Sequence, residues 1–527
     1  MTLSRRRLLA GTGAAALPRF AIAQSGTTSA AGDARPAITV AVAKISNSGV
    51  LDPLREQSSN ASEHWLGSLQ ETLIGRNQQG SLERVPMLAT AWRRIDAATV
   101  ELSLRPGVIM HDGHEMTAED VAFSFGPDRM FGGGTSAIPK DVVAVASRHW
   151  PALQRVAVVD RHTVRFVNAT PDVTMEGRLS AGGSEITSKA AWLATGNWQA
   201  NASHCVGTGP YRLREFRPDA SLTLEAHDQY WGGRPPLKSL RFVEVPEAQS
   251  RVDGLLSGEY QFAADLPADA IPGIEKNRRF EVQGGLVLNH RIITFDEHNP
   301  ALVDPRARLA MAQAIDGRAI IDALWAGRSL VPAGLQWPFY GDMFVKGWTV
   351  PPYDPAAART LLKQSGYKGE PVAYRVRNNY YTAELPTAEI VAEFWKAIGL
   401  NVQIAVEENW GQVLAKPGRG VRDWSNSAVF DDPVSSIVNQ HGPHGGQQLD
   451  GEWTNAEMNT LCGVLQTGTD HAKRKAAFAR MLQICEREDP AYIVLHQNAV
   501  FTGKPRALPW RQPPSFFLDF SPRNWKA

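Results

Sequence analysis

Residues 111–121 have the sequence His-Asp-Gly-His-Glu-Met-Thr-Ala-Glu-Asp-Val, which combines a turn signal with the start of a helix. The pair Asp112-Gly113 is typical of a tight turn. Thr117 can cap a helix, because a carboxylate follows at the third helical position, Asp120, and completes a capping box. This stretch therefore predicts a turn that leads directly into a well-defined helix.

Strand and helix signals alternate on both sides of this stretch. Short β-rich or alternating runs predict strands over residues 38–43, 99–104, 155–159, 163–167, 211–216, 221–226, 240–245 and 492–501. The second half is richer in helices, which are predicted to begin after the caps Asp304, Asp354 and Asp470. Strands interleaved with helices predict an α/β fold.

A further helix is expected near the N-terminal end of the fold. Ser62 can cap a helix that begins at Glu63. Trp65, Leu69 and Leu73 then recur at helical spacing, which predicts one continuous amphipathic helix over this segment.

The first 23 residues have the pattern of an export signal. Consecutive arginines, Arg5 and Arg6 among them, precede a short apolar run over residues 8–17, and Ala21-Ile22-Ala23 has the small-x-small pattern of a signal-peptidase site. An apolar run of this length is too short for a hydrocarbon core of about 30 Å, which needs about 20 helical residues. The arginines indicate the twin-arginine (Tat) route. We expect a Tat-like signal peptide over residues 1–23, cleaved near Ala23, and a flexible mature N-terminus over residues 24–36.

Composition excludes several other classes of protein. The 527 residues allow two or three domains, and 55 Lys and Arg balance 54 Asp and Glu without a basic stripe, so nucleic acid is not an expected partner. Three cysteines are too few for a disulfide scaffold, and whether Cys462 and Cys485 pair stays open. The mature protein is expected to be soluble outside the cytoplasm, in the periplasm.

Short motifs in a fixed order extend over nearly all of the mature chain. They are 51–53 (LDP), 88–92 (LATAW), 104–108 (LRPGV), 111–113 (HDG), 116–121 (MTAEDV), 207–211 (GTGPY), 230–232 (YWG), 314–316 (AID), 353–355 (YDP) and 398–400 (IGL). By these motifs the chain resembles the family-5 extracytoplasmic solute-binding proteins of ABC transporters, which include the dipeptide, oligopeptide and nickel-binding proteins.

The resemblance implies a two-lobe periplasmic-binding-protein fold of type II, the Venus-flytrap kind, with an extra inserted domain. The expected parts are lobe I over residues 37–65, 201–285 and 496–527, an inserted small domain over 66–200, and lobe II over 286–495. It also implies that a solute is captured between the lobes by hinge closure and delivered to the ABC permease. The expected partners are therefore a short peptide or small molecule and the permease. We expect a monomer that meets the membrane only through that permease, with no cofactor.

The segment over residues 424–433 (WSNSAVFDDP) bears on the ligand. The resemblance implies that peptide-binding relatives have an aspartate four residues before this proline, which pairs with the α-ammonium of the peptide. Here the position is Val429, and a buried ammonium without a counter-charge is costly. A free amine is therefore not expected to be recognised in the usual way, unless Asp431 or Asp432 substitutes. Peptides stay possible, and an opine, a modified amino acid or a sugar-like solute is an alternative.

Other predicted ligand-binding residues come from two loops. One follows the expected strand over residues 372–376, and the other follows the first strand. Their aromatic and polar side chains are of the kind that lines small-molecule pockets, although ordinary loop residues have the same composition. The predicted ligand-binding residues are therefore Trp424, Val429, Asp431, Arg377, Asn378, Tyr380, Tyr381, Ser46 and Asn47.

Two alternative functions stay open at this point. An exported hydrolase of peptides or amides would need a nucleophile with a base, and the sequence has no G-x-S-x-G, H-E-x-x-H or Walker motif, so no enzyme is expected. A metal or metallophore-binding protein would need a ligand set. His441 and His444 lie on a glycine-rich loop, but no carboxylate or thiolate nearby completes their ligand set. His111 and His114 lie in a stretch that the resemblance implies to be a structural surface turn before the capped helix. No metal-binding residue is therefore predicted.

Overall fold

The computed structural model describes residues 33–56, 60–134, 137–377 and 380–525. The chain divides into two units, Met1–Ala34 and Arg35–Ala527, and every element described below belongs to the second. The predicted signal peptide over residues 1–23 lies outside the described residues, as do most of the segment 24–36 and the predicted ligand-binding residue Asn378.

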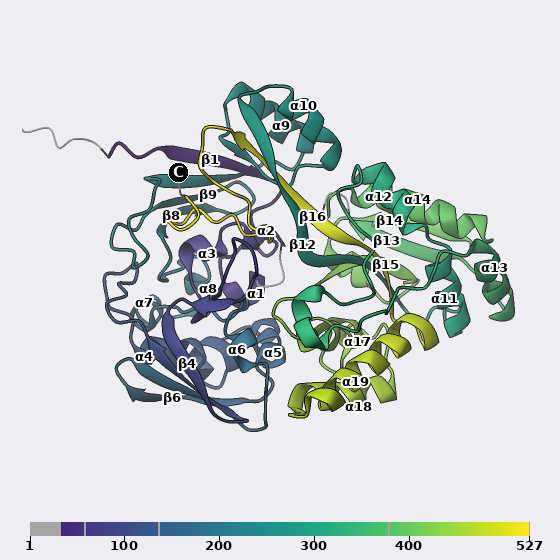
Figure 1. Cartoon of the computed structure of the whole chain (residues 1–527), viewed down its shortest axis with the longest axis horizontal. Helices are drawn as coiled ribbons and strands as arrows, with labels where there is room; N and C mark the ends of the chain where they lie inside the picture. Colours follow the sequence, from purple (N-terminus) through teal and green to yellow (C-terminus); the bar gives the residue numbers. More distant parts are fainter. Residues whose placement is uncertain (1–32, 57–59, 135–136, 378–379, 526–527) are drawn as a thin grey trace, which may run out of the picture. The chain divides into compact units, whose positions relative to one another are not determined.

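A ten-stranded mixed sheet is the main element of the second unit. Its spatial order is β14 (Val402–Glu407), β13 (Val372–Arg377), β15 (Val421–Ser427), β12 (Phe280–Phe295), β16 (Tyr492–Pro505), β11 (Phe262–Ala263), β1 (Ala37–Val42), β10 (Ser239–Glu244), β9 (Ser221–Ala226) and β8 (Tyr211–Arg217). We call the strands β1 and β8–β11 with their surroundings lobe I, and β13–β15 with their surroundings lobe II. Strands β12 and β16 join the two groups (Figure 1).

The joining strands are long and locally irregular. β12 and β16 pair antiparallel, from Phe280 opposite Pro505 to Thr294 opposite Tyr492, with a register shift between Leu286 and His290. The side-chain amide of Gln497 donates to the carbonyl of Val287 at 2.8 Å within this irregular stretch. A bulge interrupts the hydrogen-bond ladder and changes the direction of the side chains. The side chains of residues 287 and 288 therefore do not follow the regular alternation of the sheet.

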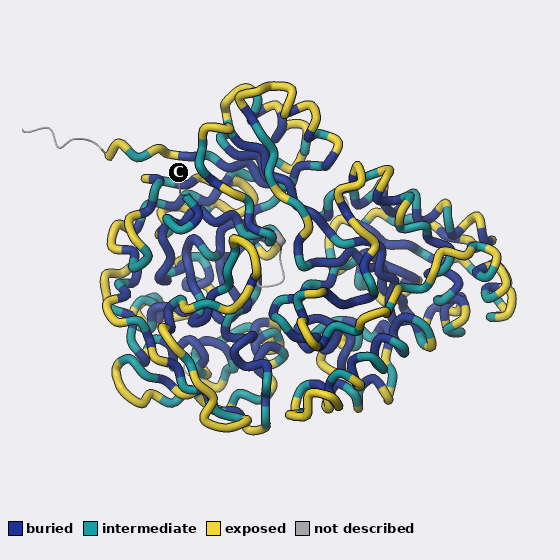
Figure 2. The backbone as a smooth tube through the Cα atoms, viewed as in Figure 1, coloured by how far each residue is buried: buried dark blue, intermediate teal, exposed yellow. Residues whose placement is uncertain are grey.

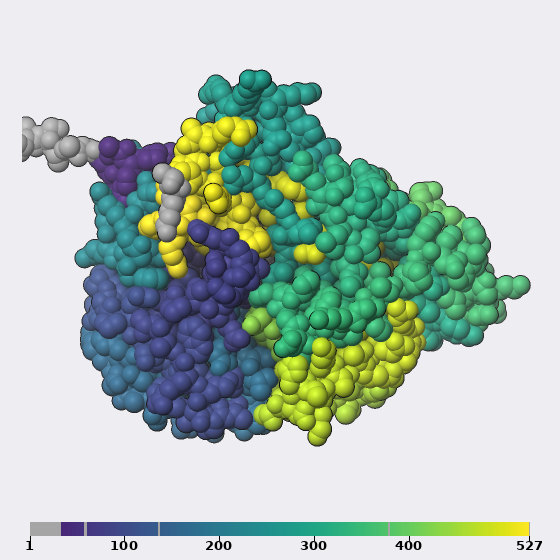
Figure 3. Space-filling model, in the orientation of Figure 1, coloured from purple at the N-terminus to yellow at the C-terminus, as the bar shows by residue number. Residues whose placement is uncertain are grey.

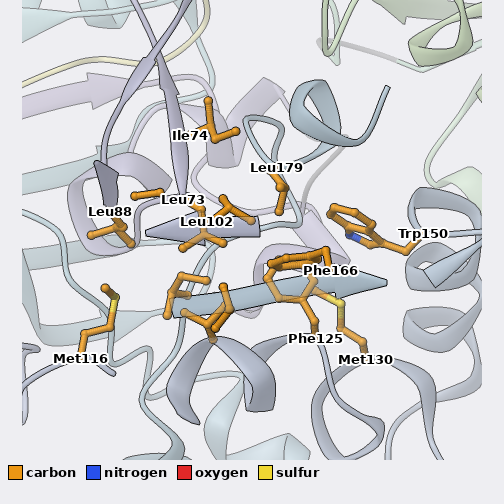
Figure 4. Close-up of a cluster of buried hydrophobic side chains, with 14 of the residues drawn as sticks. Leu73, Ile74, Leu88, Leu102, Met116, Phe125, Met130, Trp150, Phe166 and Leu179 are labelled. Carbon is orange, nitrogen blue, oxygen red and sulfur yellow. The ribbon is translucent and has the colours of Figure 1, made fainter. Parts of the chain in front are cut away.

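A separate four-stranded antiparallel sheet lies in the N-terminal half. Its order is β4 (Ala89–Asp96), β5 (Thr99–Leu104), β7 (Thr163–Asn168) and β6 (Leu153–Asp160). Helix α4 (Ala118–Ser124) packs against it and begins with the predicted capping box, in which Thr117 accepts from Glu119 N and the Asp120 carboxylate accepts from Thr117 N. Figure 4 shows the apolar core beneath this sheet, where Phe125, Trp150 and Phe166 meet edge to face or tilted.

Helices cover the sheets with one face and are exposed on the other (Figure 2). In lobe II and beside it they are α11 (Pro305–Gln313), α12 (Gly317–Leu324), α13 (Pro355–Gln364), α14 (Glu384–Ala397), α15 (Trp410–Leu414), α16 (Ile437–His441), α17 (Gly446–Leu449), α18 (Ala456–Thr467) and α19 (His471–Gln483). In the rest of the unit they are α1 (Pro53–Glu56), α2 (Asn60–Glu63), α3 (Leu66–Leu69), α5 (Lys140–His149), α6 (Met175–Arg178), α7 (Lys189–Thr195), α8 (Trp198–Asn201), α9 (Ala248–Ser257) and α10 (Ile271–Glu275). Asp304, Asp354 and Asp470 cap α11, α13 and α19, as predicted.

The prediction of one helix that starts at Glu63 is wrong. Two four-residue helices, α2 and α3, take its place, and Leu73 lies beyond both. Ser62 does not cap, because it lies inside α2 and its hydroxyl donates to Glu56 O at 2.7 Å. The buried Trp65 interrupts the helix, since its indole N–H donates to Ile45 O at 2.8 Å and anchors the turn to lobe I. The tertiary contact outweighs a weak local helical preference.

The C-terminal segment returns to the N-terminal part of the chain, and in Figure 3 these yellow residues lie beside purple and dark blue ones. Tyr211 OH donates to Phe520 O at 3.0 Å, which ties the segment to β8. Cys205, Cys462 and Cys485 are all buried free thiols, so the possible Cys462–Cys485 disulfide is not formed. Within the described part of the chain, no helix has the length and apolarity needed to cross a membrane.

Candidate functional site

A cavity of 440 Å³ lies where the two lobes meet. Its walls come from the segment of residues 63–87, from the C-terminal residues 514–523, and from the end of β15 and the irregular part of β12. These segments are distant in sequence and come together only in the folded chain. Cavities of about 300–1,000 Å³ with mostly apolar walls and a few polar groups are typical small-ligand sites.

The lobe II wall is apolar and contains Val429. Val429 and Ala428 follow β15, and they line the cavity together with Val287 and Leu288 of β12. Ala428 N donates to Leu288 O at 2.9 Å, which fixes the two segments side by side. The predicted ligand residue Val429 therefore lies on the cavity wall, within an apolar patch.

The opposite wall is built by α3, the hairpin of β2 (Ile74–Arg76) and β3 (Arg84–Pro86), and the C-terminal residues. The ring of Phe517 lies directly on Gly67, where an added Cβ would stand 2.7 Å from the ring Cζ. Only glycine permits this approach without a shift of the ring. Phe517 and its neighbour Phe516 thereby supply aromatic surface to the cavity.

Two opposite charges on this wall are weakly partnered. The carboxylate of Glu63 accepts no hydrogen bond from a described residue. Burial raises the pKa of Glu63 to about 7, although the charges of Arg76 and His64 act to lower it. Arg76 Nε donates one long hydrogen bond, 3.5 Å, to Ser180 Oγ, and its guanidinium lies 5.7 Å from the centre of the Phe339 ring. Burial lowers the pKa of Arg76 to about 10, although Asp431 and Glu63 oppose the change. Near neutral pH Arg76 is charged and Glu63 titrates, and both residues line the cavity.

The other cavity carboxylates are already engaged, and among them Asp519 Oδ1 accepts a hydrogen bond from Ser521 N at 2.8 Å. Glu71 accepts hydrogen bonds from Tyr230 OH and Trp231 Nε1, each at 2.7 Å, and from Thr208 Oγ1 at 3.1 Å, with the guanidinium of Arg523 at 3.6 Å. Burial nevertheless raises its pKa. Glu185 accepts from Gly183 N at 2.7 Å, and burial raises its pKa to about 7. These groups have roles inside the fold that Glu63 lacks.

A second cavity of 200 Å³ also lies between the lobes and contains three of the predicted residues, Asn47, Tyr380 and Tyr381. Asn47 Nδ2 donates to Tyr380 OH at 3.3 Å, a hydrogen bond that links lobe I with lobe II. Phe516 lines both cavities, so they adjoin at this ring. The predicted residues thus divide between two neighbouring spaces.

The other predicted residues that the structure describes, Ser46, Arg377, Trp424 and Asp431, lie outside both cavity linings. Ser46 is buried and donates to Glu56 Oε1 at 3.0 Å, and Arg377 donates to Glu408 O at 3.3 Å. Trp424 is half-buried beneath the guanidinium of Arg422, 4.0 Å from its ring centre. Asp431 forms an ion pair with Arg84 at 3.0 Å.

Asp432, the other aspartate considered as a substitute at the ligand site, does not line either cavity. It accepts two hydrogen bonds from Arg474, at 2.8 and 2.9 Å, and caps Val434 N at 3.0 Å. Because Asp431 is paired with Arg84, neither aspartate offers an unpaired carboxylate to the Val429 wall.

The histidine pairs lie in polar and packing contacts. His441 is buried, with Nδ1 2.6 Å from Gln447 Oε1 and its ring tilted against that of Tyr492, 4.4 Å between the ring centres. His111 Nε2 lies 3.0 Å from Gly209 O. Among the described residues, no cluster of three or more His, Cys, Asp and Glu has the arrangement of a metal site.

Sequence reasoning missed most of the cavity. Glu63, Arg76 and Arg523 carry no motif, and only the aromatic pair Phe516-Phe517, after two prolines in a C-terminal loop, is an unusual local signal. An apolar pair in a proline-rich loop is either a packing element or part of an interaction surface, so the pattern alone does not decide.

Three comparisons with known proteins bear on the family and the fold of the chain. The family model described as bacterial extracellular solute-binding proteins, family 5 (middle), matches residues 83–443, more than half of the chain. The dipeptide-binding protein of Escherichia coli K12 is 26% identical over 452 residues, which cover 80% of this chain and 82% of that protein. The chain also has the fold of two solved binding proteins. One is the periplasmic protein DppA of Helicobacter pylori with the peptide STSA, at a TM-score of 0.78, 20% identity and coverage of 92% and 97% of the two chains. The other is MoaA of A. tumefaciens R10 with mannopinic acid, at a TM-score of 0.78, 18% identity and coverage of 93% and 99%.

Proposed function

This chain belongs to family 5 of the bacterial extracellular solute-binding proteins and is the solute-binding subunit of an ABC uptake transporter, and we propose that it captures its solute in the 440 Å³ cavity beside Val429. The predicted type II two-lobe fold is confirmed. The family consists of binding proteins rather than enzymes, and its members work with ABC permeases. Like its relatives, the protein acts in the periplasm.

The solute is a small polar molecule of the peptide or opine class. One observation carries this proposal: the cavity combines an apolar lobe II wall with an opposite wall that carries Glu63 and Arg76. Such a cavity suits a ligand with both polar ends and an apolar body. The relatives that bind a peptide and mannopinic acid support the same size class.

Capture proceeds by closure of the two lobes about β12 and β16. The contacts that connect the opposing sides include the ion pair Arg84–Asp431 and the hydrogen bond from Asn47 to Tyr380. A ligand that touches both walls favours the closed arrangement by its differential affinity for it. The permease then recognises the closed protein, which acts as a monomer and meets the membrane only through that permease.

Of the alternatives, a metal carrier and an exported hydrolase are less well supported. His441 and His111 are engaged within the fold, and the cavity offers no nucleophile with a base beside it. We also propose that residues 1–23 are a Tat-like signal peptide, cleaved near Ala23, on the strength of the consecutive arginines and the small-x-small pattern.

A thermal-shift screen tests the function directly. The panel contains unmodified dipeptides, opines, sugars and metal chelates. A ligand at 100 times its Kd should raise the free energy of unfolding by about 2.7 kcal/mol. We expect a zwitterionic peptide or opine to stabilise the protein. Stabilisation by a metal chelate alone would contradict the proposed solute class, and turnover of any panel member would contradict a pure binding function.

A further inference from the structure

We propose that Glu63 recognises a cationic nitrogen of the solute and that Arg76 recognises an anionic group of the same molecule. This inference rests on the proposed function, because it assigns the charge pattern of the ligand in the same cavity. Position 429 has a valine and no carboxylate. The inference places the counter-charge for an ammonium on the opposite wall of the cavity, at Glu63.

The first support is the position of Glu63. It is the last residue of α2, and it is followed by His64 and Trp65, which are both buried. His64 Nε2 lies 3.1 Å from Asp265 Oδ1, and the Trp65 indole donates to Ile45 O at 2.8 Å. These two anchors fix the turn, so the carboxylate of Glu63 is held at the cavity surface by its neighbours rather than by contacts of its own.

The second support is the state of the charged groups around the cavity. Glu71 and Glu185 are hydrogen-bonded within the fold, whereas among the described residues Glu63 accepts no hydrogen bond and Arg76 donates only the long one to Ser180. Burying a charge is costly unless a partner compensates for it. A ligand with both charge signs would compensate Glu63 and Arg76 together, and would satisfy the fork of Arg76 with a carboxylate.

The third support comes from neutral acceptors on the same wall. Gln70 and Gln78 both line the cavity, and the Oε1 atom of each is buried without a hydrogen-bond partner among the described residues. Carbonyl oxygens accept hydrogen bonds from N–H donors, as a carboxylate does. Glu63 and these amides therefore form an acceptor-rich wall that suits an ammonium or a similarly protonated nitrogen.

Protonation of Glu63 gives this inference a distinctive signature. Burial raises the pKa of Glu63 to about 7, and a bound cation favours the ionised carboxylate. Ligand binding at pH 6 should therefore release protons, and affinity should fall severalfold from pH 8 to pH 6. The other titratable and charged groups around this cavity are His64 beside Glu63, Arg76 with the nearby Arg84–Asp431 pair, and Glu71, Glu185, Asp519 and Arg523 in the cavity lining.

Calorimetric titration of the full-length mature protein is the test, with dipeptides, N-acetylated dipeptides, C-amidated dipeptides, opines and uncharged sugars as probes. Buffers of different ionisation enthalpy report the protons released. We expect binding of compounds with a protonatable nitrogen and at least tenfold weaker binding after N-acetylation. Glu63→Gln should weaken the same compounds at least tenfold and abolish the proton release at pH 6, and Arg76→Gln should remove the preference for free over amidated carboxylates.

Glu297→Gln is the matched control. The pKa of Glu297 is also raised by burial, but this residue lies outside the cavity, beside Thr454, so its substitution should change neither affinity nor proton release. Equal binding of acetylated and free compounds, or proton release that persists in Glu63→Gln, would overturn the inference. Tight binding of uncharged sugars alone would also overturn it while leaving a solute-binding function, whereas no binding by any class would count against the proposed function itself. Should Glu63→Gln fail to fold, Glu63→Asp takes its place: it keeps the charge but shortens the side chain and should weaken the same compounds, and unchanged affinity would overturn the inference.

Discussion

Asp431 and Arg84 form an ion pair of 3.0 Å that joins the loop after β15 to strand β3. Asp431 comes two residues after Val429 on the apolar wall, and Arg84 pairs in register with Arg76 on the opposite wall. The ion pair therefore connects the two sides of the cavity next to the residues that we assign to the ligand. About a third of each side chain is exposed, 36% and 33%, so solvent screens the interaction.

Removal of this ion pair should weaken ligand capture only modestly. For Arg84→Gln we expect a loss of about 0.2–1 kcal/mol in binding, because partly exposed pairs contribute that much, with the difference shrinking at high salt. Stopped-flow dissociation should show the loss mainly as a faster off-rate. Arg93→Gln is the control, because Arg93 of β4 pairs with Glu101 of the adjacent strand β5, an ion pair within the four-stranded sheet that does not cross the cavity. An equal effect of both substitutions would argue against a cross-cavity contact.

A carboxylate at position 429 should favour peptides. Val429→Asp adds a negative charge to the wall formed with Ala428 and Leu288, where peptide-binding relatives are expected to have one. Removing one partner of a buried charge pair costs about 2–5 kcal/mol of binding free energy, so adding the missing partner should strengthen binding. The desolvation of the new carboxylate offsets part of this gain. We expect tighter binding of dipeptides with a free amine, by about 1 kcal/mol.

The same titration with N-acetylated dipeptides is the control for Val429→Asp, because these compounds have no ammonium to pair with Asp. A parallel gain for acetylated and free peptides would mean that the new side chain acts through shape or a general change in the cavity, and would remove the charge argument.

Ligand binding should also compact the protein. The two lobes are connected by β12 and β16, and the irregular stretch between Leu286 and His290 interrupts the ladder at the cavity. Small-angle scattering should show a smaller radius of gyration when the ligand identified by titration is added. An unchanged radius at saturating ligand would contradict hinge closure while leaving the cavity as the binding site.

The export route is testable in cells. Replacement of Arg5 and Arg6 together with Lys should retain the precursor in the cytoplasm, because the consecutive arginines are the predicted Tat determinant. Fractionation followed by immunoblotting measures this. Normal export that depends on the Sec machinery instead would exclude the Tat route and leave the periplasmic location intact.

Local signals predicted much of the fold because they act over a few residues. Thr117, Asp304 and Asp354 each accept a backbone N–H at a helix start, which their sequence context already indicates. The segment after Ser62 shows the limit of this reasoning. Its helical periodicity is real, but the indole of Trp65 bonds to Ile45 and breaks the helix, and no local pattern reveals that distant carbonyl.

The site was predicted only in part, for a similar reason. Val429 could be identified because it replaces an expected aspartate within a recognisable segment. Glu63 and Arg76 could not, since their importance comes from what surrounds them: neither has a strong partner in the described structure, and both face a cavity that segments hundreds of residues apart create. Trp424 looked like a wall residue but packs beneath Arg422 instead.

The central claim, that solute binds in the cavity between the lobes, is tested most directly by filling that cavity. Val429→Trp adds a large ring to the apolar wall, while Val406→Trp, at a site 50% exposed on β14, adds the same ring to the surface. Isothermal titration of both variants with the tightest ligand of the wild type is the measurement, with circular dichroism to verify folding. We predict that Val429→Trp loses at least a hundredfold in affinity, about 2.7 kcal/mol, and that Val406→Trp binds as the wild type does. Unchanged affinity in a folded Val429→Trp protein would contradict the assignment of the cavity as the ligand site.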